Sequence, residues 1–130
     1  LDTNICIYII NQKPPVILAK FQSIPLGEIG ISIITLAELY YGAVKSASPD
    51  KNISALNRFV IPLEIFNFDH SAALEYGIIR SNLEKKGTPI GSLDMLIAAH
   101  AKSMDFIVVT NNEKEFSRVE GLRIENWIKE

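Results

Sequence analysis

Apolar residues recur along the chain with two different periods, which predicts short strands alternating with helices. Spacings of three and four residues are typical of helices, and compact apolar runs of four to eight residues are typical of buried strands. We expect helices over 5–10, 16–23, 35–43, 53–60, 71–86 and 92–101, strands over 29–34, 61–68, 106–110 and 122–127, and one helical turn within 111–116. This alternation predicts an α/β domain with a mostly parallel sheet that is covered on both faces.

Polar residues mark where several of these helices begin. Asp2, Thr3 and Asn4 are good cap residues for the first helix. Thr35 and Glu38 have the spacing of a capping box, in which each side chain bonds to the backbone near the other. We also expect Ser92 to be the N-cap of the helix over 92–101.

The helix over 92–101 is apolar almost all round, which predicts that it is buried. Asp94 breaks this pattern, and helical spacing places it on the face of Ile97, Ala98 and Ala101. A carboxylate among apolar neighbours costs free energy unless it is hydrogen-bonded, paired or bound to a cation. Asp94 therefore either complements the helix dipole or belongs to a functional site.

Composition limits the range of functions. We expect residues 1–130 to form one domain, with 48% hydrophobic and 22% charged residues. A net charge of −2 excludes a general positive field as the means of binding nucleic acid. Cys6 is the single cysteine, and no apolar run is long enough to span a membrane, so we expect a cytoplasmic protein with no membrane association. The sequence starts at Leu1 without methionine, and we expect preceding residues to form most of a first strand.

Acidic and amide side chains gather at the predicted carboxyl ends of the strands, where open parallel sheets bind ligands. Asp2 follows the first strand, Glu38 lies one turn into the next helix, and Asp94 opens its own helix. The strand over 106–110 is followed by a further group, Thr110, Asn111, Asn112 and Glu115. Each residue alone has an explanation as a helix cap, but capping does not explain why this edge is so acidic. Carboxylates held together repel one another unless a cation neutralises them, and oxygen ligands favour Mg²⁺ or Mn²⁺.

Other chemistries fit the sequence less well. His70 and His100 are the only histidines, and helical spacing turns His100 away from Asp94. The chain has no Gly-x-Ser-x-Gly elbow, phosphate-binding loop or dinucleotide fingerprint.

Four segments in this order resemble the PIN domains, and among them the VapC-type toxins of bacterial toxin–antitoxin pairs. They are Leu1–Asn4, Thr35–Leu39, Pro89–Ala98 and Thr110–Phe116. The resemblance implies a three-layer α/β/α fold around a central, mostly parallel sheet of four to five short strands. It also implies a Mg²⁺-dependent endoribonuclease, with Mn²⁺ as a substitute ion, that cuts structured RNA such as transfer RNA. The implied partners are a cognate antitoxin and a second copy of the chain, in a homodimer and a toxin–antitoxin hetero-oligomer.

The resemblance also assigns roles to individual residues. Asp2 and Asp94 would hold the metal, and Glu38 would complete the acidic site. Many PIN domains carry an aspartate where this chain has Asn112, and we expect Glu115 to supply the fourth carboxylate instead.

We further expect Glu38 or Glu115 to position the attacking water or to accept its proton. Thr110 and Asn112 would hydrogen-bond the metal ligands or the phosphate, and Asn4 would fix Asp2.

Two alternatives remain open at this stage. The sequence also fits an interaction module whose main role is antitoxin binding. Tyr40, Tyr41 and the apolar segment 5–10 would form its binding surface. A phosphotransfer enzyme of the haloacid-dehalogenase type also places an aspartate after its first strand. That chemistry requires a second acid two residues later, where this chain has Asn4.

Overall fold

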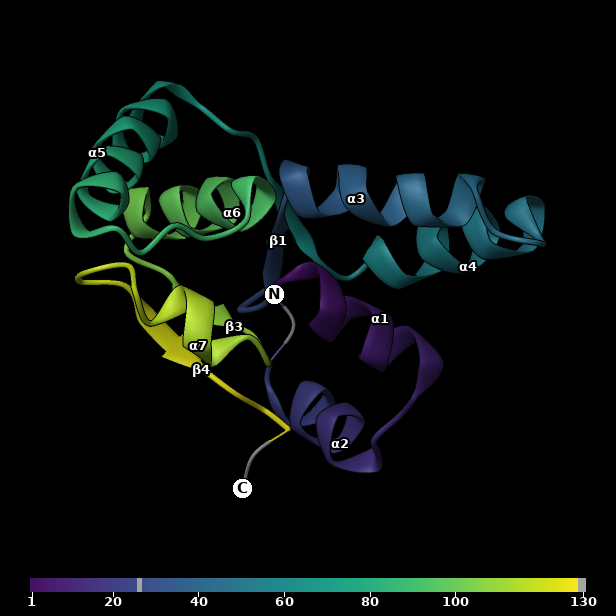
Figure 1. The fold of residues 1–130 in the computed structure, drawn as a ribbon. Coiled ribbons are helices and arrows are strands. Elements are labelled where there is room, and N and C mark those ends of the chain that lie inside the picture. Colours follow the sequence, from purple (N-terminus) through teal and green to yellow (C-terminus); the bar gives the residue numbers. More distant parts are fainter. Residues whose placement is uncertain (26, 129–130) are drawn as a thin grey trace.

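A computed structural model describes residues 1–25 and 27–128 of the chain (Figure 1). Helices and strands alternate along most of this part of the chain. In order they are α1 (Thr3–Asn11), α2 (Pro15–Ser23), β1 (Gly30–Ser32), α3 (Ile33–Val44), α4 (Pro49–Val60), β2 (Glu64–Phe66), α5 (His70–Lys86), α6 (Ser92–Ser103), β3 (Ile107–Val109), α7 (Glu113–Phe116) and β4 (Arg123–Glu125). Every predicted element is present, and each strand is shorter than predicted.

The strands form two parallel pairs. β1 pairs with β2, with Ile31 opposite Ile65, and β3 pairs with β4, with Val108 opposite Ile124. The parallel arrangement is confirmed, but the described residues form two sheets of two strands and not the single sheet of four to five strands that we expected.

The backbone of the first two residues lies between these pairs. The amino group of Leu1 donates to the Gly30 carbonyl at 2.9 Å, and the Asp2 N–H donates to the Val109 carbonyl at 3.0 Å. One bond to each pair is fewer than a strand ladder contains, which is why the two pairs are not joined into one sheet. A first strand ahead of Leu1 stays a prediction.

Helices cover both faces of the strands. Neighbouring residues of a strand point to opposite faces, and the two buried valines of β3 show this directly. Val108 packs in the cluster formed with α5 and α6, whereas Val109 packs with Ile5, Ile9 and Ile17 of α1 and α2. This arrangement is the predicted three-layer α/β/α architecture.

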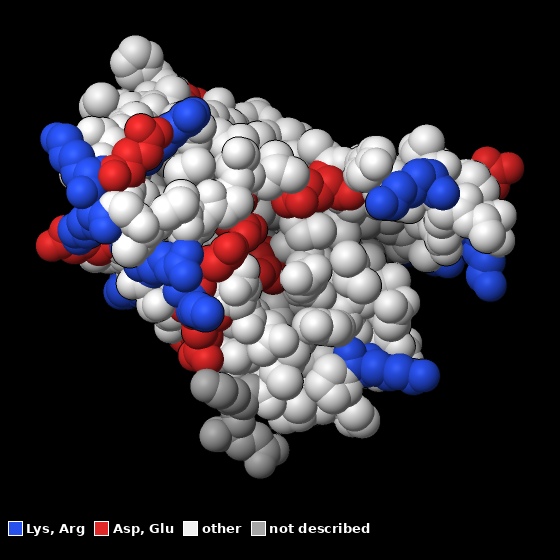
Figure 2. Space-filling model, viewed as in Figure 1, with Lys and Arg blue, Asp and Glu red and all other residues white. Residues whose placement is uncertain are grey.

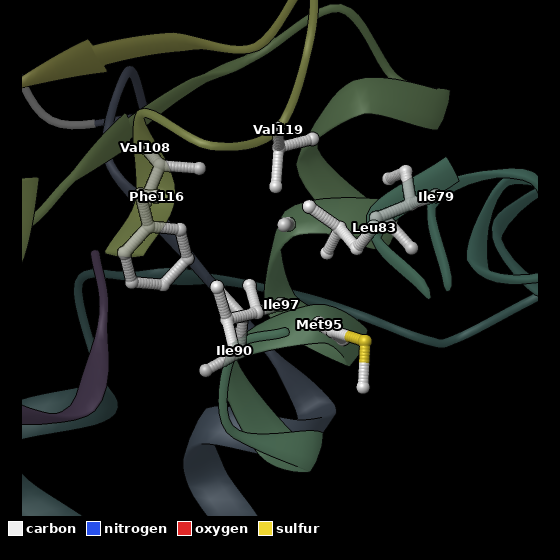
Figure 3. Close-up of a cluster of buried hydrophobic side chains, with 10 residues drawn as sticks. Ile79, Leu83, Ile90, Met95, Ile97, Val108, Phe116 and Val119 are labelled. Atoms are coloured by element: carbon white, nitrogen blue, oxygen red, sulfur yellow. The ribbon is translucent and has the colours of Figure 1, made fainter. Parts of the chain in front are cut away.

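The larger core cluster lies between α5, α6, β3 and α7. Figure 3 shows its labelled side chains directed into one shared space: Ile79, Leu83, Ile90, Met95, Ile97, Val108, Phe116 and Val119. Phe116 is fully buried and is the largest of the completely enclosed side chains. Because Phe116 follows Glu115 in α7, its burial fixes the short helix that carries a candidate site residue.

Helices α3 and α4 pack side by side and project from the rest of the molecule as an arm (Figure 1). Cys6, Ile31, Leu39 and Leu56 form the core cluster at its base. Tyr41 on the arm keeps 67% of its surface exposed. None of the helices in 1–25 and 27–128 combines the length and the apolar character needed to cross a membrane.

Two of the predicted helix caps are wrong. α3 begins two residues earlier than expected because Ser32 is its N-cap, with its hydroxyl accepting from the Ile34 N–H at 3.0 Å. Thr35 is therefore buried inside the helix and forms no capping box. α6 starts at Ser92 itself, with Gly91 as the N-cap and no capping bond from a side chain.

Candidate functional site

The predicted acidic residues come from four helices that meet near the middle of one face. Asp2 is the N-cap of α1, Glu38 lies in α3, Asp94 lies in the first turn of α6, and Glu115 lies in α7. Figure 2 shows Asp and Glu side chains gathered in this part of the surface, where α1, α3, α6 and α7 meet in Figure 1. The fold thus brings together residues that lie far apart in the sequence.

Asp2 is held rigidly by hydrogen bonds to both of its carboxylate oxygens. Oδ1 accepts from the Ile5 N–H at 2.9 Å, and Oδ2 accepts from the Thr110 hydroxyl at 2.5 Å. The Thr110 hydroxyl in turn accepts from the Asn112 N–H at 2.8 Å. Burial raises the pKa of Asp2 above its usual value, and the bonds from Thr110 and Ile5 oppose that rise. Thr110 therefore links Asp2 to the start of α7.

Asp94 and Glu115 form a second group, joined by Asn112. The Asn112 amide donates to Glu115 Oε2 at 2.8 Å and to Asp94 Oδ2 at 3.5 Å. Burial, the bond to Glu115 and the charges of Glu115, Asp2 and Glu38 raise the pKa of Asp94 to about 7. The hydrogen bond with Asp94 holds the pKa of Glu115 below its usual value. Near neutral pH, Asp94 is therefore close to its pKa while Glu115 is ionised.

Glu38 is positioned by Thr3, which the sequence indicated only as a possible cap of the first helix. The Thr3 hydroxyl donates to Glu38 Oε1 at 2.8 Å. Thr3 and Glu38 are 35 positions apart in the sequence, so local spacing holds no signal for this contact. Because Ser32 caps α3, Glu38 is not occupied by a capping box and is turned toward α1.

The expected role of Asn4 is wrong. Asn4 is exposed, and none of the described hydrogen bonds joins it to Asp2. Both oxygens of Asp2 already accept bonds from Ile5 and Thr110, so the carboxylate is fixed without Asn4.

The donor chemistry of this site fits a hard divalent cation. All four acidic groups offer oxygen ligands, and their mutual repulsion favours a bound positive charge. Within the described residues, however, no group of three or more His, Cys, Asp or Glu side chains is close enough to form a metal site. The four carboxylates therefore lie on the same face, but no three of them are close enough together to bind one ion.

The stability of the protein is expected to depend on pH through Asp94. Its pKa of about 7 in the folded protein lies above the value of about 3.9 for an unfolded chain. The folded state therefore binds more protons between about pH 5 and pH 7, and the free energy of unfolding falls as pH rises through this window. We expect the melting temperature in EDTA to fall over this range in the wild type and to change less in Asp94→Asn. Equal slopes in both proteins would contradict the assigned pKa.

A cavity lies away from the acidic group. It has a volume of about 500 Å³ and lies between β1 and β3, with Phe66, Ile97 and His100 among its lining residues. His100 is buried, its Nδ1 lies 2.7 Å from the Ser32 hydroxyl oxygen, and burial lowers its pKa. His100 is therefore a core residue and does not belong to the acidic group. None of the four candidate carboxylates lines this cavity.

Comparison with known proteins agrees with this arrangement. The PIN domain model matches residues 1–122. A Salmonella typhimurium protein named tRNA(fMet)-specific endonuclease VapC is 46% identical over 127 residues, which is 98% of this chain and 96% of that protein. A Haemophilus influenzae protein named Ribonuclease VapC2 is 46% identical over 128 residues, which is 98% of this chain and 96% of that protein.

Solved structures give the same result. The chain is similar to one in a structure of DNA-bound VapBC from Salmonella typhimurium, with a TM-score of 0.92, 46% identity, and coverage of 98% of this chain and 96% of that chain. It is also similar to one in VapBC2 from Rickettsia felis bound to a promoter DNA fragment, with a TM-score of 0.90, 44% identity and the same coverage. The chain therefore belongs to the PIN-domain family, and within that family to its VapC group.

Proposed function

We propose that this protein is a metal-dependent endoribonuclease that hydrolyses RNA phosphodiesters, and the toxin component of a toxin–antitoxin pair. The observation that carries the proposal is the convergence of Asp2, Glu38, Asp94 and Glu115 from four helices at one face. The names of the relatives support RNA as the substrate, and transfer RNA as its class.

In this proposal, Asp2 and Asp94 hold a divalent ion, Mg²⁺ with Mn²⁺ as a substitute. When bound, this ion supplies a Lewis acid for the phosphoryl oxygen and lowers the pKa of a water molecule. Thr110 keeps Asp2 oriented by donating to its Oδ2. The Asn112 amide donates to Glu115 and Asp94, whereas a fifth acid at this position would repel both.

Glu38 and Glu115 are the candidates for handling the proton of the attacking water. The Thr3 hydroxyl donates to Oε1 of Glu38, and Oε2 stays available as an acceptor. The lowered pKa of Glu115 keeps this carboxylate ionised at neutral pH, so it is able to accept a proton. The Thr110 hydroxyl is fully buried and already bonded to Asp2 and to the Asn112 N–H, so Thr110 orients these residues and not the phosphate.

The proposed partners are a cognate antitoxin, a second copy of the chain and the RNA substrate. The titles of the similar structures describe VapBC complexes, which supports a hetero-oligomer of this kind. We place the protein in the cytoplasm, because its single cysteine is a buried free thiol.

A second candidate is an interaction module with little catalysis. The exposed Tyr41 and Val44 on the arm favour it, because apolar side chains of this size are suited to covering by a partner.

The deciding experiment measures cleavage of a panel of transfer and messenger RNAs by purified, partner-free protein. We expect site-specific cutting in Mg²⁺, weaker or equal cutting in Mn²⁺, and none in EDTA until metal is restored. Cutting that continues in EDTA would exclude the metal mechanism. No cutting of any RNA by folded protein in Mg²⁺ would favour the interaction module.

A further inference from the structure

Two basic side chains border the acidic group on the side of α7. Lys114 precedes Glu115, and Arg118 follows it by three residues, about one helical turn later. Figure 2 shows basic side chains beside the acidic group, over the place where Figure 1 draws α7. In the part of the chain that the structure describes, neither Lys114 nor Arg118 forms an ion pair.

Some basic residues of this protein are neutralised by a carboxylate. Four other basic residues pair with carboxylates at distances of 2.9 to 3.4 Å: Arg80 with Glu84, Lys86 with Glu120, Lys102 with Glu75, and Arg123 with Asp105. Lys114 is exposed, and no acid is bound to it although the chain carries more acidic than basic residues. Its ammonium group is therefore available to a ligand.

Arg118 is held in a fixed position beside the site. Its Nη1 donates to the Pro89 carbonyl at 2.7 Å, and Pro89 lies two residues before the N-cap of the helix that carries Asp94. Its charge also helps to lower the pKa of Glu115. A guanidinium has five N–H donors, so the bond to Pro89 leaves donors with which it can bind an anion.

We infer that Lys114 and Arg118 bind backbone phosphates of RNA next to the phosphodiester that is cut. This inference rests on the proposed function. An acidic site in a chain of net charge −2 repels RNA, so local cations are needed to hold the strand against it. Phosphates carry no base information, so these contacts provide affinity and not sequence choice.

The test measures binding of a fluorescent single-stranded RNA by anisotropy in Mg²⁺, over a range of salt concentrations. Asp94→Asn serves as the background, so that the RNA is not cut during the measurement. We expect Lys114→Gln and Arg118→Gln each to weaken binding and to reduce the slope of log K against log salt by about 0.7. RNAs of different base sequence should be affected equally.

Lys51→Gln is the charge-matched control. Lys51 is exposed in the first turn of α4, at the far end of the arm (Figure 1), and its replacement changes the net charge by the same amount. The inference is wrong if Lys114→Gln and Arg118→Gln bind RNA as Lys51→Gln does, or if no variant binds RNA.

Two further outcomes separate the hypotheses. If these variants weaken an antitoxin complex and leave RNA binding unchanged, the two cations serve a protein partner and the inference is wrong. If Lys114→Gln and Arg118→Gln weaken RNA binding but the wild type cuts no RNA, the inferred phosphate contacts are supported and the proposed nuclease activity is wrong.

Discussion

Replacing Asp94 by asparagine is expected to abolish site-specific RNA cleavage while leaving the protein folded. The substitution keeps the size of the side chain but removes the carboxylate. The pKa of this carboxylate is raised by burial and by repulsion from the neighbouring acids. Loss of one preorganised charged group lowers kcat by about 10²–10³, and we expect at least this reduction at saturating Mg²⁺. Single-turnover cleavage of a labelled target RNA measures the effect.

Asp50→Asn is the matched control for this experiment. Asp50 also lies in the first turn of a helix, but in α4 on the arm, where it is exposed. Both variants remove one negative charge near a helix N-terminus, so a difference between them reports the site and not the helix dipole. The assignment of Asp94 fails if its asparagine variant cuts RNA as well as Asp50→Asn does.

Replacing Phe116 by alanine is expected to cause the largest loss of stability of any change near the site. Phe116 is fully buried in the cluster shown in Figure 3. Deletion of a buried phenylalanine side chain lowers the free energy of unfolding by about 3–5 kcal/mol. Urea unfolding followed by circular dichroism measures this. Because Phe116 adjoins Glu115, we also expect weaker cleavage by the protein that remains folded.

Phe106→Ala provides the comparison, because Phe106 is 43% exposed and contacts Phe66 edge-on at a centroid distance of 5.2 Å. It removes the same atoms from a partly solvated position, so we expect a smaller loss of stability. If the two variants were equally stable, Phe116 would not be an anchor of α7.

The order and type of the elements could be predicted from the sequence because hydrophobic periodicity is a local property. Element boundaries were less predictable. The run Ile31–Ile34 has the β-branched character of a strand, yet β1 ends at Ser32 and α3 begins at Ile33. The capping bond of Ser32 decides this boundary, and the Thr35–Glu38 spacing, which predicts a later start, has no influence on it.

The membership of the acidic site could be predicted, but its internal contacts could not. Asp2, Glu38, Asp94 and Glu115 follow from motif spacing and strand order. The bonds Thr3–Glu38 and Thr110–Asp2 join residues 35 and 108 positions apart, so they exist only after the helices and strands have packed. Asn4 shows the opposite case. It lies two residues from Asp2 in the sequence, yet none of the described hydrogen bonds joins it to Asp2.

The bond between Asp2 and Thr110 also bears on how the protein is made. Its two residues are 108 positions apart, so a ribosome must synthesise the whole segment from Asp2 to Thr110 before the bond forms. A nascent chain of the first hundred residues contains Asp2, Glu38 and Asp94 but lacks Thr110, Asn112 and Glu115. The acidic site is therefore completed only after Glu115 has been made. A nascent chain that has not reached this residue cannot assemble the site while it is attached to the RNA machinery that produces it.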